Sequence, residues 1–285
     1  MNIQQALVTG MQLLRDFKVP SAELDAEVLL AYALSKDRAK LYSEAEIPLT
    51  ATQRKHYQDM LARRASREPV AYLVGQREFY NLALQINCHV LVPRPETETL
   101  VELALERIRS AGLERVRVLD VGTGSGAIAL AVAKNAPQAR VTAVDISSSA
   151  LEIARTNAKR LKLGQRVGFK RSDLLSQVEG RYDLILANLP YLTTQQLREL
   201  PTDIREFEPS LALSGGPDGL HIYEKLLRQL RIVATPASRV LCEIGPNLKS
   251  GFDHLVRHHL GAQTQVQFHP DLAGRVRVAE FAILE

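Results

Sequence analysis

The chain has 285 residues, a length that suggests one large domain or two modest ones. Hydrophobic residues make up 46% of it and charged residues 24%, which excludes a disordered, collagen-like or coiled-coil chain. The net charge of +4 comes without a run of five or six like charges and without an interleaved Arg/aromatic stripe, so the basic excess indicates a solvated surface rather than a nucleic-acid footprint.

The cysteine content and the N-terminal residues indicate in which cellular compartment the protein is expected. Cys88 and Cys242 are too few for a disulfide framework or a cysteine-rich zinc site, and we expect no metal. No apolar run reaches the roughly 20 residues that span a bilayer. The first residues lack the basic start and apolar core of a signal peptide. We therefore expect a soluble, cytoplasmic protein with no membrane partner.

Residues 1 to about 72 carry a helical pattern. Apolar residues recur at helical spacing at the start: Ile3, Leu7, Met11 and Leu14. Ser21 is a candidate N-cap for a second helix, and Thr50–Gln53 has the capping-box pattern of a third helix that ends near Ser66. The pattern predicts a small bundle over residues 1–74. Such a bundle is either a stabilising appendage or a docking module for a macromolecular substrate.

From Gly75 the hydrophobic period changes to two. Tyr80, Leu82, Leu84 and Ile86 alternate with other residues, as in a half-buried strand. With Cys88–Val92 as its partner, this strand predicts a β-hairpin linker over residues 75–95. The segment Pro93-Arg94-Pro95-Glu96-Thr97-Glu98 then breaks regular structure, and a helix follows it.

Residues 96–285 form the third predicted part, in which short β-rich runs alternate with helical patterns. The predicted strands are Val116–Val121, Arg140–Asp145, Arg166–Lys170, Tyr182–Asn188, Arg239–Gly245, Thr264–Phe268 and Arg275–Leu284. The predicted helices between them include Ala127–Asn135, Ala150–Leu161 and Ile222–Ala234. This alternation predicts an α/β fold with a mostly parallel sheet, closed by an antiparallel hairpin.

A glycine-rich loop follows the first of these strands: Asp120-Val121-Gly122-Thr123-Gly124-Ser125-Gly126-Ala127. Glycines let the backbone turn sharply and approach a ligand at the N-terminus of the next helix. The loop also satisfies the dinucleotide pattern G-x-G-x-x-G/A, so a nicotinamide enzyme stays open at this point, as does a purely structural turn.

Two further strand ends carry acids. Asp145, followed by Ile146, lies 23 positions after Gly122 (145 − 122), where a carboxylate can accept both ribose hydroxyls of an adenosine ligand. The next strand leads to Asp173 and Leu174, where the acid can accept the adenine amino group. Each acid alone could be a helix N-cap. Their coincidence with the glycine loop predicts one binding crevice at the carboxyl edge of the sheet.

The fourth strand runs into Asn188-Leu189-Pro190-Tyr191. The side-chain oxygen of Asn188 and a main-chain carbonyl of this turn can both accept hydrogen bonds from one NH2 group. Tyr191 can stack on the flat face beside it. The segment thus suits a planar nitrogen substrate, although an Asn-x-Pro turn also ends strands that have no such role.

With these motifs the sequence resembles the class I S-adenosylmethionine-dependent methyltransferases that carry an (N/D)-P-P-(Y/F) motif. Within them it is similar to the peptide-chain release-factor glutamine methyltransferases, over nearly the whole chain. Phe207-Glu208-Pro209 and Gly215-Gly216-Pro217-Asp218-Gly219-Leu220 belong to the resemblance as well. Leu189 departs from it, because the family has a proline there. Pro190 still restricts Leu189, but the fixed φ of a first proline is lost.

The resemblance implies a seven-stranded, mostly parallel Rossmann-like methyltransferase sheet and methyl transfer to the side-chain amide nitrogen (N5) of a glutamine. The substrate is then the Gly-Gly-Gln motif of class 1 peptide chain release factors, the cofactor S-adenosyl-L-methionine and the product S-adenosyl-L-homocysteine. The implied cofactor-binding residues are Asp120, Gly122, Thr123, Gly124, Ser125, Gly126, Asp145, Ile146, Asp173, Leu174 and Asn188. The implied substrate-binding residues are Asn188, Leu189, Pro190 and Tyr191, of which Asn188, Pro190 and Tyr191 are the catalytic ones.

Other functions remain open at this point. A ribosomal-protein glutamine methyltransferase shares the catalytic half, and an N6-adenine or exocyclic-amine nucleic-acid methyltransferase uses the same motif. The near-balanced charge and the lack of a large insertion for reading base edges argue against a nucleic-acid substrate. A catalytically dead binding module is disfavoured by the intact motifs. We assign no general base, expect His221, His254, His258 and His259 to be structural, and expect a monomer.

Overall fold

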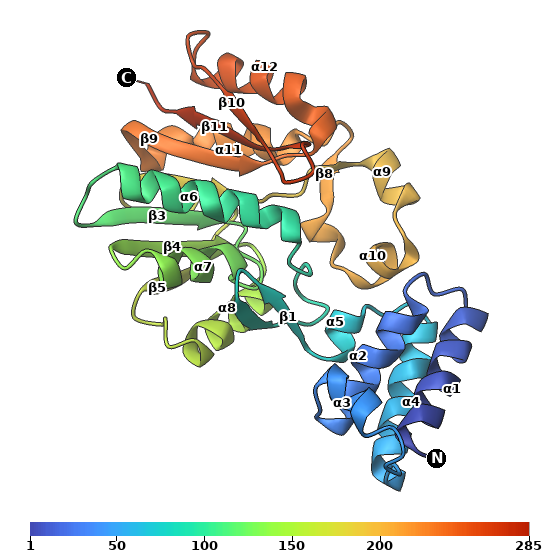
Figure 1. The fold of residues 1–285 in the computed structure, drawn as a ribbon. Helices are drawn as coiled ribbons and strands as arrows, with labels where there is room; N and C mark the ends of the chain where they lie inside the picture. The colour runs from blue at the N-terminus through green and yellow to red at the C-terminus, as the bar shows by residue number, and fades with distance from the viewer. Residues whose placement is uncertain (285) are drawn as a thin grey trace. The chain divides into compact units, whose positions relative to one another are not determined.

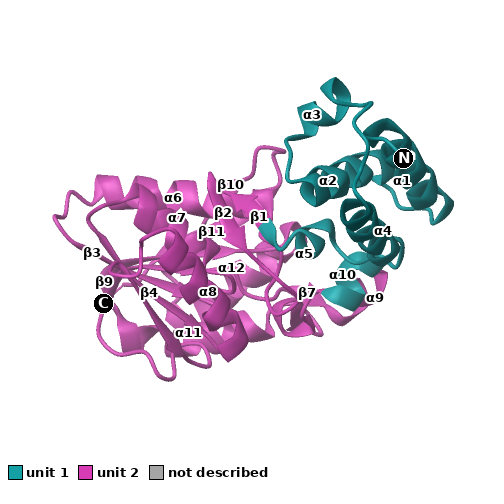
Figure 2. Ribbon diagram, turned by 90° about the horizontal axis from the view of Figure 1, so that it is seen from below, with its two compact units in different colours: residues 1–76, 201–207 teal, residues 77–200, 208–285 magenta. Residues whose placement is uncertain are grey.

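The structure is a computed structural model that describes residues 1–284. The chain divides into two compact units, coloured separately in Figure 2. Unit 1 consists of Met1–Gln76 together with the short segment Pro201–Phe207. Unit 2 takes up the remaining described residues.

Unit 1 is helical. Its helices are α1 (Ile3–Asp16), α2 (Ala22–Leu34), α3 (Arg38–Ser43), α4 (Ala51–Ala65), α5 (Val70–Leu73) and α10 (Thr202–Phe207). The predicted capping box at Thr50 and Gln53 is confirmed at the start of α4. Ser21 is the N-cap of α2, but its hydroxyl donates to Asp25 instead of capping the backbone.

A buried arginine holds α10 within unit 1. Arg64 of α4 is almost inaccessible, and its Nε donates to Oδ2 of Asp25 in α2 at 2.7 Å. Both terminal nitrogens of Arg64 donate to Oδ2 of Asp203 in α10 at 3.1 Å. Burying a guanidinium without partners is costly, so this pairing fixes Pro201–Phe207 against the bundle helices.

The predicted hairpin forms with a different partner. Its strands are β1 (Gln76–Phe79) and β2 (Leu82–Gln85), so the expected pairing of the second strand with Cys88–Val92 is wrong. The turn residues Tyr80 and Asn81 have φ of 47° and 58°. These left-handed values are those of a tight two-residue hairpin turn, which breaks the alternating run at Tyr80.

Unit 2 is built on the predicted sheet, and the α/β fold with a seven-stranded, mostly parallel sheet is confirmed (Figure 1). Its strands are β3 (Val116–Val121), β4 (Ala139–Asp145), β5 (Val167–Arg171), β6 (Tyr182–Ala187), β9 (Ala234–Glu243), β10 (Gln267–Pro270) and β11 (Val276–Ala282). The spatial order is β10-β11-β9-β6-β3-β4-β5. Pairing is parallel from β9 to β5, and β11 is antiparallel to both of its neighbours.

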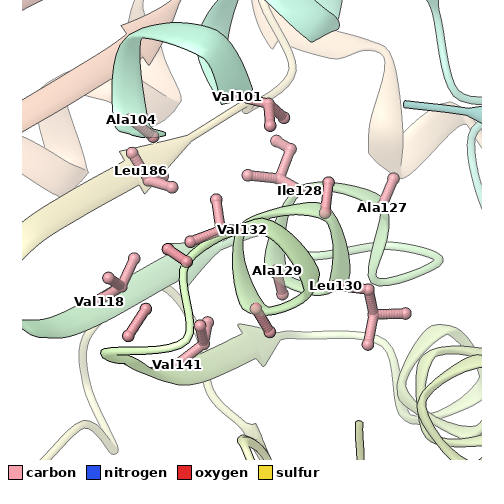
Figure 3. Packing of buried hydrophobic residues seen from close by; sticks show 14 of the residues in the cluster. Val101, Ala104, Val118, Ala127, Ile128, Ala129, Leu130, Val132, Val141 and Leu186 are labelled. Carbon is pink, nitrogen blue, oxygen red and sulfur yellow. The ribbon is translucent and has the colours of Figure 1, made fainter. Parts of the chain in front are cut away.

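Helices cover both faces of this sheet. Successive side chains of a strand point to opposite faces, so the apolar residues of the central strands need a covering layer on each side. Val118 belongs to a buried cluster with side chains of α6 (Glu98–Ser110) and α7 (Ala127–Asn135), several of which Figure 3 labels. Its neighbour Leu119 belongs to the cluster that includes side chains of α11 (His221–Val233) and α12 (Lys249–Leu260). Helix α8 (Ser148–Arg160) adds Ala158 to the first cluster.

Other elements of unit 2 are short. They are η1 (Pro95–Thr97), β7 (Leu192–Thr193), α9 (Thr194–Glu199), η2 (Ser210–Ala212), β8 (Ser214–Gly216) and η3 (Pro246–Leu248). Helix α12 has no counterpart among the predicted helices, and β10 begins at Gln267 rather than at the predicted Thr264. Among residues 1–284, no helix combines the length and the apolar character that crossing a membrane requires.

The strand order places a switch point beside β3. After β3 the chain continues to β4 on one side, and the later strand β6 lies on the other side. Loops that leave β3 and β6 therefore diverge at the carboxyl edge of the sheet. In open α/β sheets this divergence leaves the crevice in which ligands bind.

Candidate functional site

A cavity lies at this carboxyl edge, wholly within unit 2. Loops after β3, β4, β5 and β6 line it, together with residues before α6, around η2 and on α11. The predicted site residues that line it are Gly122, Thr123, Gly124, Ser125, Asp145, Ile146, Asp173, Leu174, Asn188, Leu189 and Pro190. Asp120, Gly126 and Tyr191 were also predicted as site residues and are not among its lining residues.

Two glycines of the loop meet close neighbours. Gly122 has φ of +74°, and a Cβ there would lie 2.9 Å from Cδ2 of Leu189. Gly126 has φ of +83°, and a Cβ there would lie 3.2 Å from Cβ of Ala154 in α8. The loop therefore needs glycine both for its backbone conformation and for the approach of its neighbours.

Asp120 stabilises the glycine-rich loop through hydrogen bonds from outside the cavity lining. It is fully buried, and its Oδ2 accepts hydrogen bonds from Thr123 Oγ1 at 2.6 Å and from the Ala129 backbone at 3.2 Å. Burial raises the pKa of Asp120 to about 7, although both hydrogen bonds oppose the rise. The geometry gives Asp120 a role in shaping the loop and the first turn of α7.

Asp145 lines the cavity and also braces it. One carboxylate oxygen accepts from the Gly124 backbone at 2.8 Å and the other from the Ser147 backbone at 2.9 Å. Burial raises the pKa of Asp145, and these hydrogen bonds oppose the rise. Beside it, Leu174 has φ of +49°, a left-handed value that a leucine adopts only when its surroundings enforce it.

Asn188 follows β6 and has a fixed carboxamide. Its Nδ2 donates to Oγ1 of Thr97 at 3.1 Å, and both residues line the cavity. With Nδ2 committed to Thr97, the oxygen Oδ1 is the part of the carboxamide that can accept a hydrogen bond from a ligand.

Glu243 lies behind this pair at the end of β9. Its side chain is almost completely buried, and burial raises the pKa of the carboxyl group. Thr97 and Tyr191 both face the carboxyl group, and their hydroxyls oppose that rise. The hydroxyl of Tyr191 donates to Oε1 at 3.3 Å. Tyr191 is thus turned toward Glu243, and a stacking role on a substrate amide stays a prediction.

The Gly215–Leu220 segment packs against the turn that follows Asn188, and Glu208 joins two other segments that line the cavity. A Cβ on Gly215 would lie 2.7 Å from Cα of Tyr191, and one on Gly219 would lie 2.4 Å from its carbonyl oxygen. Only glycine fits where the Gly215–Leu220 segment crosses this backbone. Glu208 forms an ion pair with Arg94, which joins the loop before α6 to the segment before η2.

Sequence reasoning missed Thr97 and Glu243 as parts of the site. Thr97 lies in the segment singled out as a breaker of regular structure, which carried no assignment for its hydroxyl. Glu243 had a usable signal, because it is an acid near the carboxyl end of a predicted buried strand, as Asp145 is.

Asp120 should make folding stability depend on pH. An acid whose pKa is higher in the folded chain keeps a proton that the unfolded chain releases, so the free energy of unfolding falls as pH rises between 3.8 and about 7. Because asparagine does not titrate, Asp120→Asn should make the slope of the unfolding free energy against pH shallower, by up to about 1.4 kcal/mol per pH unit in this range. Urea denaturation at several pH values measures this slope, and Asp37→Asn is the control because Asp37 is exposed. An unchanged slope for Asp120→Asn would contradict the assignment.

Comparisons with known proteins agree with this geometry. Residues 5–75 match the family described as PrmC N-terminal domain, and residues 97–203 match the methyltransferase small domain. A methyltransferase structure from Pyrococcus furiosus is 19% identical, with a TM-score of 0.53 over 80% of this chain and 100% of that one, and supports the fold alone.

Two relatives have the same name, release factor glutamine methyltransferase. The one from Rhodopirellula baltica is 41% identical over 90% of this chain and 88% of its own. The one from Koribacter versatilis is 40% identical over 98% of this chain and 97% of its own. The chain belongs to the family of release factor glutamine methyltransferases.

Proposed function

We propose that this chain transfers a methyl group from S-adenosylmethionine to the side-chain amide nitrogen of the glutamine in the Gly-Gly-Gln motif of class 1 release factors. The observation that carries the proposal is the carboxamide of Asn188, which Thr97 fixes at the rim of the cavity. The names of the relatives support the choice of substrate.

The residues of the cavity fit the cofactor, S-adenosylmethionine. No atom lies within 4 Å of where a Cβ on Gly124 would be, which leaves room for a ligand beside this backbone. Asp145 offers a carboxylate held by two backbone groups. Asp173 and Leu174 line the same cavity. Asp145 would hold the ribose hydroxyls, and the glycine loop would hold the methionine portion. When bound, the cofactor supplies an electrophilic methyl group.

The reacting nitrogen of a glutamine is a weak nucleophile, because its lone pair is delocalised into the carbonyl group. Oδ1 of Asn188 would accept a hydrogen bond from the substrate NH2 group, and a carbonyl oxygen of the Asn188–Tyr191 turn would accept the second. These two acceptors would orient the amide and favour electron density on its nitrogen. Alignment of this kind contributes several kcal/mol to lowering the barrier.

The substrate assignment is tested by incubating the chain with S-adenosylmethionine and a purified class 1 release factor. Mass spectrometry of the Gly-Gly-Gln peptide should show the gain of one CH2 unit on the glutamine. Asn188→Ala should lower the rate by on the order of 100-fold and leave cofactor affinity nearly unchanged, because it removes an orienting acceptor.

Three results would contradict these expectations. A release factor in which alanine replaces that glutamine should gain no mass, and a gain there would place the methyl group elsewhere. Transfer to a ribosomal protein or to DNA, with none to the release factor, would overturn the substrate. A wild-type rate for Asn188→Ala would overturn the orienting role.

The hydroxyl of Thr97 should matter more than its bulk. Thr97→Val preserves shape but removes the acceptor for Nδ2 of Asn188, so the carboxamide loses its fixed orientation. The turnover number should fall about tenfold, with the KM for S-adenosylmethionine nearly unchanged. Thr97→Ser keeps the hydroxyl and should recover most of the rate. Equal rates for the valine and serine variants would rule out the hydrogen bond as the cause.

We propose further that unit 1 binds the release factor outside its Gly-Gly-Gln loop, because contacts remote from the reacting group must supply binding energy for a weak nucleophile. Its exposed apolar side chains include Val8, Phe17 and Leu24, which are 61%, 57% and 49% exposed.

Replacing each of these three by aspartate tests the docking role. At least one variant should raise the KM for release factor by about tenfold, the effect of losing one strong apolar contact. Cofactor affinity should stay unchanged. Leu113→Asp is the matched control, since Leu113 is 48% exposed in unit 2. Docking through these residues is contradicted if all three variants keep the KM of the unaltered chain.

A further inference from the structure

The position after Asn188 carries a hydrogen bond that a proline could not form. Leu189 is buried, and its backbone N–H donates to the hydroxyl oxygen of Tyr223 at 3.2 Å. Tyr223 belongs to α11, on the side of the sheet opposite α7. Its own hydroxyl donates to the backbone carbonyl of Glu243, so the hydroxyl bridges the strand ends of β6 and β9.

The donor and acceptor roles in this bridge are unambiguous. A tyrosine hydroxyl has one proton, and the Glu243 carbonyl can only accept it. The lone pairs of the hydroxyl oxygen are then available to the Leu189 N–H. Burial raises the pKa of Tyr223 well above its ordinary value, so the hydroxyl keeps its proton. The ring of Tyr223 packs edge-on against Phe252 with centroids 5.2 Å apart, which fixes where the hydroxyl lies.

We infer that Tyr223 is a positioning residue for Asn188 in this chain, and that its hydroxyl replaces the restraint that a proline at position 189 would give. A proline there would fix its own φ and restrict the residue before it. Leucine gives neither restraint directly. The hydrogen bond to Tyr223 instead fixes the plane of the peptide between Asn188 and Leu189, which limits ψ of Asn188 and φ of Leu189.

The same peptide carries the carbonyl oxygen of Asn188, which would lie 3.6 Å from a Cβ at Gly122. A rotation of this peptide would therefore change the approach of the glycine loop as well as the direction of the Asn188 side chain. Leu189 adds a second contact on that side, because its Cδ2 approaches Gly122 most closely. Tyr223 thus acts through the backbone on both halves of the cavity.

The inference rests on the proposed function, and a double-mutant cycle tests it. Tyr223→Phe should lower the turnover number for release-factor methylation on the order of tenfold when leucine is at position 189. Combined with Leu189→Pro, the same substitution should change it less than about twofold relative to Leu189→Pro alone, because proline has no N–H to donate. Equal effects in the two backgrounds, or no effect in either, would overturn the inference.

Tyr182→Phe is the matched control. Tyr182 is also a buried tyrosine, and its hydroxyl donates to the Glu179 carbonyl, away from the cavity. It should not change the turnover number. A similar loss in Tyr182→Phe and Tyr223→Phe would show a general effect of removing a buried hydroxyl and would overturn the positioning role.

Amide hydrogen exchange gives a second readout that needs neither proline variant nor release factor. The Leu189 N–H should exchange at least about tenfold faster in Tyr223→Phe than in the unaltered chain, since it loses its acceptor. Unchanged exchange would overturn the inference. Absence of methyl transfer by the unaltered chain would contradict the proposed function alone, and the exchange measurement would still decide the role of Tyr223.

Discussion

The buried residue Glu243 is linked to the Asn188–Tyr191 turn in three ways, one of them direct and two through the side chains of Tyr223 and Thr97. Its backbone carbonyl accepts the hydroxyl proton of Tyr223, which in turn accepts the Leu189 N–H. Its carboxyl group accepts the hydroxyl of Tyr191 and faces Thr97, the partner of Asn188. A displacement of the end of β9 would therefore disturb residues 188, 189 and 191 together.

Burying the carboxyl group of Glu243 is unfavourable in free energy, and the surrounding residues reduce that penalty. A buried carboxyl without hydrogen bonds would cost several kcal/mol, so each hydroxyl that faces Glu243 has a stabilising as well as an orienting effect. The apolar side chains of α11 and α12 pack around this end of the sheet and exclude water from it.

Sequence patterns were sufficient for the sheet because its signals are local. The β-rich runs of β3 and β6 and the glycine loop each lie within a few residues, and each motif was predicted at the strand end where it lies. The contacts that orient the motifs were not predictable in this way. Thr97 and Asn188 are 91 residues apart, and nothing in either segment specifies the other. The hairpin was mispaired for a related reason, since the left-handed turn at Tyr80 and Asn81 has no glycine to mark it.

The segment Pro201–Phe207 has a consequence for how proteins of this architecture can be recombined. Arg64 ties it to the helical bundle, although its flanking residues belong to unit 2. The bundle is therefore encoded by two separate stretches of sequence. A chimera that exchanges only residues 1–76 with those of a relative would combine a foreign bundle with the native Asp203. Exchange of both stretches preserves the buried pairing, so the two stretches are expected to change together during divergence.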